Sequence, residues 1–267
     1  KGTAAQRRRR WLQFVRMQGR LEADMGRRYR AWVRAERAET LDRFDAEAAR
    51  PGTRAAALRP GILLKELRLS AVLPDPEKSG KKLKEKTRPN RAASLDATYK
   101  FTLDELGIPT FAIDDAAIMR HFDLREKIFA GKVPVTLRDN LFASLQAGIQ
   151  NGETVQQLRS RIAEAYDIAA GSSKTLMVAR TETASFMNGI RDEMFGLQGL
   201  DSLQWVSAGD EHVRTNHVTY GASGAKPKGF DYLTLVGLGG SGALRYPGDS
   251  DAPAGEVVNC RCLSVPA

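Results

Sequence analysis

The chain has 267 residues, a net charge of +9 and 42% apolar residues. This composition suits one large or two ordinary globular domains and excludes a wholly disordered chain. The two cysteines are one residue apart, which excludes a disulfide framework. No apolar run approaches the roughly 18–20 residues of a membrane span, and the arginine-rich start does not resemble a signal peptide. We therefore expect a soluble protein of a cytoplasm-like compartment.

The positive charge is concentrated at the front of the chain. Residues 1–50 contain 14 Lys/Arg and 7 Asp/Glu, and residues 78–91 contain 7 and 1, whereas the part from residue 92 onward carries −5. Such asymmetry favours contact with a polyanion or an acidic protein surface. The alternative is an ordinary solvated face. The residues expected to contact DNA or a partner are Arg7, Arg8, Arg9, Arg10, Arg27, Arg28, Lys81, Lys82, Lys84, Lys86 and Arg88.

Residues 6–50 have the pattern of one long helix, the first part of a basic helical arm or hairpin over residues 1–73. Apolar residues recur at three- and four-residue steps and define one stripe, and arginines occupy much of the remaining surface. The stripe consists of Phe14, Met17, Leu21, Met25, Tyr29 and Trp32. It can pack on another chain or helix, or form a hairpin with residues 55–73.

Two segments of different character follow. Residues 74–109 are expected to form a basic linker, because residues 74–94 combine prolines and a lysine run with almost no apolar content. Residues 110–170 predict a helical hairpin that turns at Asn151-Gly152, with Thr136 as a helix start. His121 lies in this pattern, and we interpret it as structural.

Residues 171–267 are expected to form a small α+β domain. A helix over about 173–196 leads into glycine-rich sequence with short β-prone pieces at 203–207, at 232–236, near Val257 and at 263–265. The whole chain therefore predicts an α+β protein, mostly helical in its first two thirds, with a short sheet and long loops at the end.

The C-terminal segment also contains the residues best suited to chemistry. Cys260 and Cys262 would face the same side of a strand, with Arg261 on the other. With His217, and with His212 as a further candidate, they are candidate zinc ligands, although paired zinc cysteines usually have two or more intervening residues. Glu182, Asp210 and His217 are an alternative acid/base set. The third interpretation is a buried polar network that fixes long loops on the sheet.

The order of these residues resembles the phage head morphogenesis family, typified by protein F of phage Mu. The resemblance covers about residues 115–267 and includes Phe230, Tyr246-Pro247-Gly248-Asp249 and Pro253. Its main positions are Arg180, Thr181, Glu182, Trp205, Asp210, Arg214, His217, Asn259, Cys260, Arg261 and Cys262. Many relatives have a cysteine between the positions of Arg214 and His217, where this chain has Thr215 and Asn216. This departure weakens the zinc interpretation.

The resemblance implies a minor head protein of a tailed phage, assembled in the bacterial cytoplasm and located inside the head at the portal vertex. The implied partners are the portal protein, packaged DNA bound without sequence specificity and, in addition, the major capsid protein. We expect no enzyme activity and no cofactor. The alternatives are a metal-assisted nuclease or hydrolase using Asp210, His217, Cys260 and Cys262, and a toxin-carrier module, which the lack of a cargo segment after Cys262 disfavours.

Overall fold

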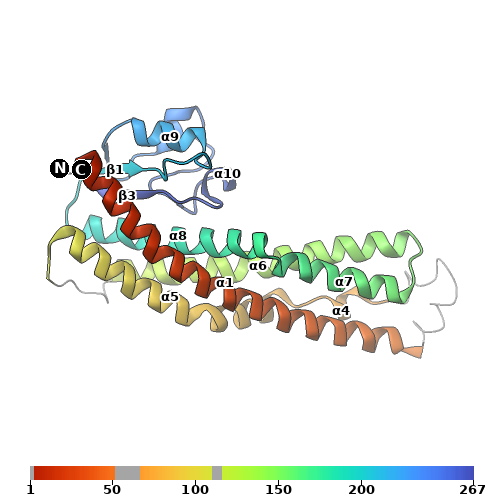
Figure 1. The fold of residues 1–267 in the computed structure, drawn as a ribbon. Coiled ribbons are helices and arrows are strands. Elements are labelled where there is room, and N and C mark those ends of the chain that lie inside the picture. The colour runs from red at the N-terminus through yellow and green to blue at the C-terminus, as the bar shows by residue number, and fades with distance from the viewer. Residues whose placement is uncertain (1–2, 52–66, 110–115) are drawn as a thin grey trace. The chain divides into compact units, whose positions relative to one another are not determined.

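Long helices dominate the computed structural model, which describes residues 3–51, 67–109 and 116–267 (Figure 1). A short three-stranded sheet near the C-terminus completes the expected α+β class. The elements are α1 (Ala4–Ala49), α4 (Leu69–Val72), α5 (Pro76–Leu106), α6 (Ala116–Gln150), α7 (Val155–Ala170), α8 (Ser172–Leu197), β1 (Ser202–Val206), α9 (Thr215–Ala222), β2 (Lys226–Pro227), η1 (Tyr232–Val236), α10 (Ala254–Val257) and β3 (Leu263–Pro266).

Contacts between residues divide the chain into two compact units. The first contains residues 1–26, 88–125 and 176–267, and the second contains residues 27–87 and 126–175. Each unit interleaves segments that the sequence analysis assigned to different domains. No helix in the described ranges is long and apolar enough to cross a membrane.

Helix α1 buries an apolar stripe at the predicted spacing. Phe14, Met25, Tyr29 and Trp32 are each at most 3% exposed. In the second unit, the Trp32 indole donates a hydrogen bond to the Ser79 carbonyl at 3.2 Å. The stripe therefore packs within this chain, as the hairpin alternative required, but helix α5 supplies this contact. Of the expected hairpin partner, residues 55–66 lie outside the described residues.

Helix α5 occupies most of the predicted linker, so that prediction is wrong. Its buried face includes small polar residues, among them Ser79, Thr87, Ser94 and Thr98. The Thr87 hydroxyl donates to the Leu83 carbonyl one turn earlier at 2.9 Å, which reduces its burial cost. The hydroxyls of Ser79, Ser94 and Thr98 have no hydrogen-bond partner among the described residues. Lysine and glutamate favour helix on the exposed positions. Low apolar content therefore concealed a packed helix.

Helices α6 and α7 lie side by side as the predicted hairpin (Figure 1). Gly148 allows their close approach, since a Cβ there would lie 2.7 Å from a methyl group of Leu158. Thr154 begins α7 with a capping box. The predicted helix start at Thr136 is wrong, because α6 continues through it and its hydroxyl donates to the Lys132 carbonyl at 2.9 Å. Residues 110–115 of the expected hairpin lie outside the described residues.

The sheet has the order β2-β1-β3, and both pairings are antiparallel. Strands β1 and β3 confirm the predicted pieces at 203–207 and 263–265. The predicted strand at 232–236 is wrong, because these residues form the 3₁₀ helix η1, in which the Asp231 carboxylate accepts hydrogen bonds from the Leu233 and Leu244 backbone N–H groups. The β-prone piece near Val257 is the short helix α10.

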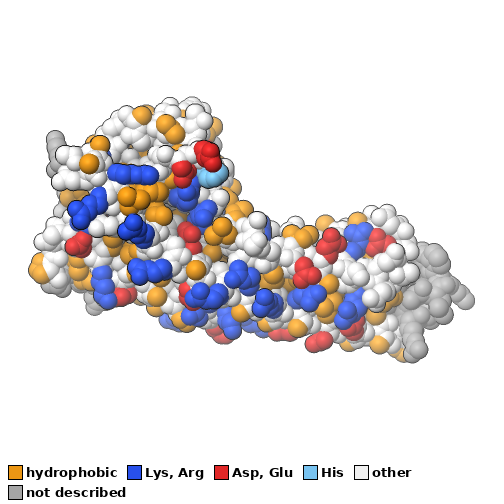
Figure 2. Space-filling view, in the orientation of Figure 1, with side chains coloured by type: hydrophobic (Ala, Val, Ile, Leu, Met, Phe, Trp, Pro, Cys, Tyr) orange, Lys and Arg blue, Asp and Glu red, His pale blue; other side chains and the backbone are white. Residues whose placement is uncertain are grey.

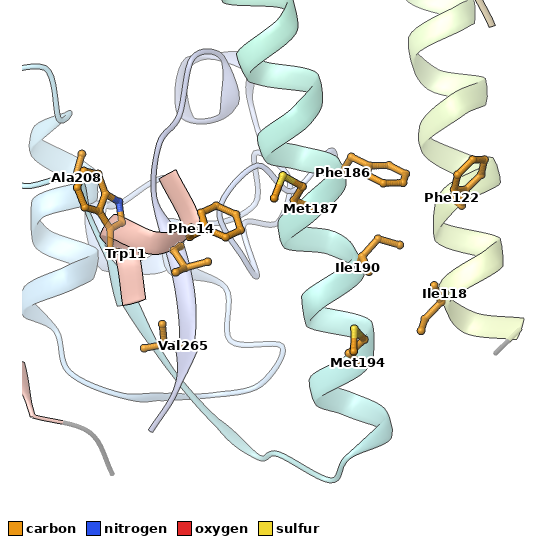
Figure 3. Packing of buried hydrophobic residues seen from close by; sticks show 11 residues of the cluster. Trp11, Phe14, Ile118, Phe122, Phe186, Met187, Ile190, Met194, Ala208 and Val265 are labelled. Atoms are coloured by element: carbon orange, nitrogen blue, oxygen red, sulfur yellow. The ribbon is translucent and has the colours of Figure 1, made fainter. Parts of the chain in front are cut away.

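The core of the first unit surrounds helix α8 (Figure 3). Phe186 on α8 packs edge-on against Phe122 of α6, with ring centroids 5.5 Å apart. Met187 and Ile190 lie on the same helix, and Phe14 of α1 lies on the other side of α8 from Phe122. This packing places α8, which carries the Arg180-Thr181-Glu182 motif, at the centre of the unit that contains the C-terminal residues.

Candidate metal centre and motif network

The two cysteines lie in the segment between α10 and β3. Asn259 adopts a left-handed conformation with φ 63°, and the chain then enters β3. Cys260 and Cys262 are each 2% exposed, whereas the Arg261 guanidinium points away and pairs with Asp210 at 2.6 Å. The predicted alternation is confirmed, although residues 259–262 precede the strand rather than belong to it.

His217 of helix α9 meets both cysteines. Its Nδ1 lies 3.3 Å from Cys262 Sγ and 3.7 Å from Cys260 Sγ, and the side chain is almost fully buried. The three residues predicted as metal ligands therefore form one buried cluster. We call His217, Cys260 and Cys262 the His–Cys cluster.

Glu256 and its partners surround the other side of the imidazole. The Glu256 Oε2 lies 3.2 Å from His217 Nε2. The same carboxylate accepts hydrogen bonds from the Asn216 amide at 2.7 Å and from the Tyr220 hydroxyl at 3.2 Å. No sequence pattern points to these residues, because only the fold brings Glu256 of α10 to α9.

The two thiols are electrostatically different. Hydrogen bonding from Cys262 and from His217 holds the pKa of Cys260 well below its usual range. Burial, together with Cys260, raises the pKa of Cys262. A lowered thiol pKa favours binding of a soft metal ion, because the thiolate is the ligating form.

The cluster has little room for anything larger than an ion. A cavity of about 10 Å³ is lined by residues that include His217, Cys260 and Cys262. This volume corresponds to about one water molecule. Trp205 closes one side, with its ring centroid 5.3 Å from that of His217, and also packs edge-on against Tyr220 and at a tilt against Tyr232. An organic or nucleotide substrate does not fit next to the imidazole.

The Arg-Thr motif on α8 connects directly to the residue before the cysteines. The Arg180 guanidinium donates to the Asn259 side-chain oxygen at 2.9 Å, and the Asn259 backbone N–H donates to the Thr181 hydroxyl at 2.9 Å. Arg214 donates to the Val258 carbonyl. Residues almost 80 positions apart thus hold the same turn, as expected for a structural polar network.

Glu182 forms ion pairs with arginines of two other helices. Its carboxylate pairs with Arg125 of α6 at 3.0 Å and with Arg91 of α5 at 3.3 Å, so its partners come from helices and not from the sheet and loops. Asp210 is held by Arg261, which lowers the pKa of Asp210. The predicted acid/base set of Glu182, Asp210 and His217 therefore does not form one site, since each member is bound to different residues.

The Tyr-Pro-Gly-Asp segment also serves the packing on α8. Gly248 has φ 84°, and a Cβ there would lie 2.8 Å from the Cα of Ser185. The fully buried Asp249 accepts hydrogen bonds from the backbone and guanidinium of Arg245. His121 packs edge-on against Tyr246, and burial lowers its pKa to about 4. These contacts agree with a structural interpretation of His121.

Several of the predicted DNA-contacting cations are used within the chain. Lys81 pairs with Glu77, Lys82 with Glu39 and Glu36, Lys84 with Glu126, and Arg10 with Asp104. Arg8 donates to the Ala208 carbonyl and Arg28 to the Lys86 carbonyl. Arg9, Arg27, Lys86 and Arg88 are exposed, and Arg7 lines a surface cleft with Arg9 and Arg10. Acidic side chains lie among the basic ones on the face seen in Figure 2.

A more regular cationic feature was missed by the sequence analysis. Arg9, Arg16 and Arg20 of α1 are all exposed, and we call them the arginine stripe. Within the described part of the chain, none of the three has an ion pair or hydrogen bond. The step from Arg9 to Arg16 is about 20° short of two helical turns, and the step from Arg16 to Arg20 is about 40° more than one turn. The three side chains therefore share one face of the helix. The spacing itself was visible in the sequence.

Comparison with known proteins gives no relative. No known family matches this sequence, and neither a curated protein nor a solved structure is significantly similar to it.

Proposed function

We propose that this protein is a structural minor head protein of a tailed phage, which docks at the portal vertex inside the head and contacts packaged DNA. One observation carries the proposal: most of the residues on which the resemblance rests join into one connected network in the first unit. Arg180 and Thr181 hold Asn259, and the next residues lead to the cysteines at His217. The polar side chains of the motif bind one another, so their role is to stabilise the fold and not to bind a substrate.

The same geometry disfavours the nuclease alternative. A metal-assisted nuclease needs an open coordination position that a phosphodiester can reach. Here His217 is 1% exposed and the adjoining cavity measures about 10 Å³. Asp210, the expected carboxylate of that site, is engaged by the Arg261 guanidinium through two hydrogen bonds.

The arginine stripe supports contact with DNA. Its members lie about 10 Å and about 6 Å apart along the helix axis. Guanidinium groups without partners among the described residues can neutralise phosphates, and such contacts are independent of base sequence and sensitive to salt. The cleft lined by Arg7, Arg9 and Arg10 has a volume of about 760 Å³ and adjoins the start of the same helix.

The portal part of the proposal is tested by assembly. The full chain, produced together with the portal protein of the same phage, should co-purify with portal rings, and it should be present in virions at low copy number. The Asn259→Ala variant breaks the polar network at its turn and should reduce this association, whereas the exposed Lys127→Gln variant serves as control. A folded chain that is absent from purified virions would contradict the proposal.

The DNA part is tested by salt-dependent binding. Replacing Arg9, Arg16 and Arg20 together by Gln should lower the slope of log affinity against log salt by about 2 to 3, because each phosphate contact contributes about 0.9. The control replaces three exposed lysines, Lys127, Lys132 and Lys174, by Gln and removes the same charge. Equal losses of DNA affinity in both variants would show that only net charge matters. Unchanged DNA binding of the arginine variant would refute a role of the arginine stripe in binding.

A further inference from the structure

We infer that the His–Cys cluster binds one zinc ion through His217 Nδ1, Cys260 Sγ and Cys262 Sγ. The inference is independent of the proposed role in the phage head. The three ligand atoms lie within 4.8 Å of one another, and all three residues are buried. Asp210, the fourth residue of the nuclease alternative, does not belong to this group.

The distances between the ligand atoms fit tetrahedral zinc. With zinc–sulfur bonds near 2.3 Å and a zinc–nitrogen bond near 2.0 Å, tetrahedral angles place nitrogen and sulfur about 3.5 Å apart. The observed distances from His217 Nδ1 are 3.3 Å to Cys262 Sγ and 3.7 Å to Cys260 Sγ. Both nitrogen–sulfur distances are thus within about 0.2 Å of the tetrahedral value. The short separation of the cysteines is compatible with this because Arg261 turns away and both sulfurs face α9.

The second side of the imidazole is arranged as it is around metal-binding histidines. Such a histidine usually presents its other ring nitrogen to a carboxylate, which fixes the tautomer and the ring orientation. Glu256 Oε2 lies 3.2 Å from His217 Nε2, close enough for a hydrogen bond but not aligned for one, and Asn216 and Tyr220 hold this carboxylate in place. A proton on Nε2 leaves the Nδ1 lone pair directed at the sulfurs. Glu256 is thus a positioning residue and not a ligand.

The ligand types and the available space select the metal and its role. Thiolate and imidazole ligands favour zinc over magnesium or calcium, which prefer oxygen. Binding replaces the thiol protons, which pass to solvent, and involves no change of oxidation state. The cavity of about 10 Å³ has room for a water molecule at the fourth position but not for a substrate. The ion would therefore tie α9 to the segment before β3.

The metal content of the full chain tests the inference. Protein produced with zinc in the medium and purified under reducing conditions without chelator should contain about one zinc ion per chain by mass spectrometry of the elements. Cys262→Ser and His217→Gln should lose this zinc, whereas His212→Gln, an exposed histidine five residues from His217, should keep it. Glu256→Gln should weaken zinc binding about 10- to 100-fold, as outer partners of metal ligands do.

A measurement on the unmodified chain guards against variants that fail to fold. After removal of zinc under reducing conditions, Co²⁺ should bind with a sulfur-to-cobalt charge-transfer band and the intense visible bands of tetrahedral coordination. Reduced protein that takes up neither zinc nor Co²⁺ would overturn the inference. A Cys260–Cys262 disulfide in freshly purified metal-free protein, or full zinc content in the His217 and Cys262 variants, would also overturn it.

Discussion

Replacement of Glu182 by Ala is expected to be one of the most destabilising single changes in the first unit. The Glu182 carboxylate is the shared partner of Arg91 and Arg125, which are 1% and 4% exposed. Removing it leaves two buried guanidinium groups without this counter-charge. Breaking a buried ion pair from one side typically costs 3–5 kcal/mol. We therefore expect the free energy of unfolding to fall by about 4 kcal/mol.

Urea unfolding followed by circular dichroism measures this change, with Glu39→Ala as the matched control. Glu39 pairs with Lys82, and both side chains are 45% exposed, so its loss should cost at most about 1 kcal/mol. The double variant Glu182→Ala/Arg125→Met should be more stable than additivity predicts, by about 1–3 kcal/mol, because one unpaired charge is also removed. A Glu182→Ala cost equal to that of Glu39→Ala would refute this reasoning.

Two further changes test the packing around α8. Gly248→Ala should lower the free energy of unfolding by about 2 kcal/mol or more, because a Cβ at φ 84° would meet the Ser185 backbone. The control Gly255→Ala should not lower the free energy of unfolding, because the space around Gly255 is open. Equal urea midpoints for the two variants would contradict the packing argument. His121 is predominantly neutral in the folded protein above its lowered pKa of about 4, so the stability it contributes is fully present above pH 6.5 and falls by about 3 kcal/mol as the pH drops towards 4. His121→Gln should remove this part of the pH dependence and His212→Gln should leave it, and an unchanged profile in the His121 variant would show that another group causes the slope.

Sequence patterns predicted the helices well where apolar residues recur, and failed where polar residues are buried. The stripe on α1 and the hairpin at Asn151-Gly152 followed directly from spacing. Helix α5 was missed because its buried residues include Ser79, Thr87 and Thr98, which have no hydrophobic signature. The Thr87 hydroxyl donates to the Leu83 carbonyl within the helix, which reduces the cost of burying it. The 3₁₀ helix at 232–236 was missed because one aspartate, Asp231, outweighs its β propensity.

The candidate site was predictable in its ligands but not in its surroundings. His217, Cys260 and Cys262 were identifiable as rare residue types suited to one kind of ligand. Glu256 and the arginine partners of Glu182 were not, since carboxylates and guanidinium groups are common and only tertiary structure selects among them. The acid/base hypothesis failed for the same reason. Glu182 and Asp210 are suitable groups, but each is paired with arginine in the fold, and the sequence does not show these pairings.

The motif network and the arginine stripe are physically connected through helix α1. The indole of Trp11 donates a hydrogen bond to the Arg261 carbonyl at 2.9 Å, and Arg261 lies between the two cysteines. Trp11 is two residues from Arg9, about 200° around the helix, so fixing Trp11 in the first unit turns Arg9 outward. Arg16 and Arg20 share that outward face. The segment that holds the His–Cys cluster therefore also sets the rotation of α1, and loosening this segment should disturb the presentation of the stripe without changing any of its arginines.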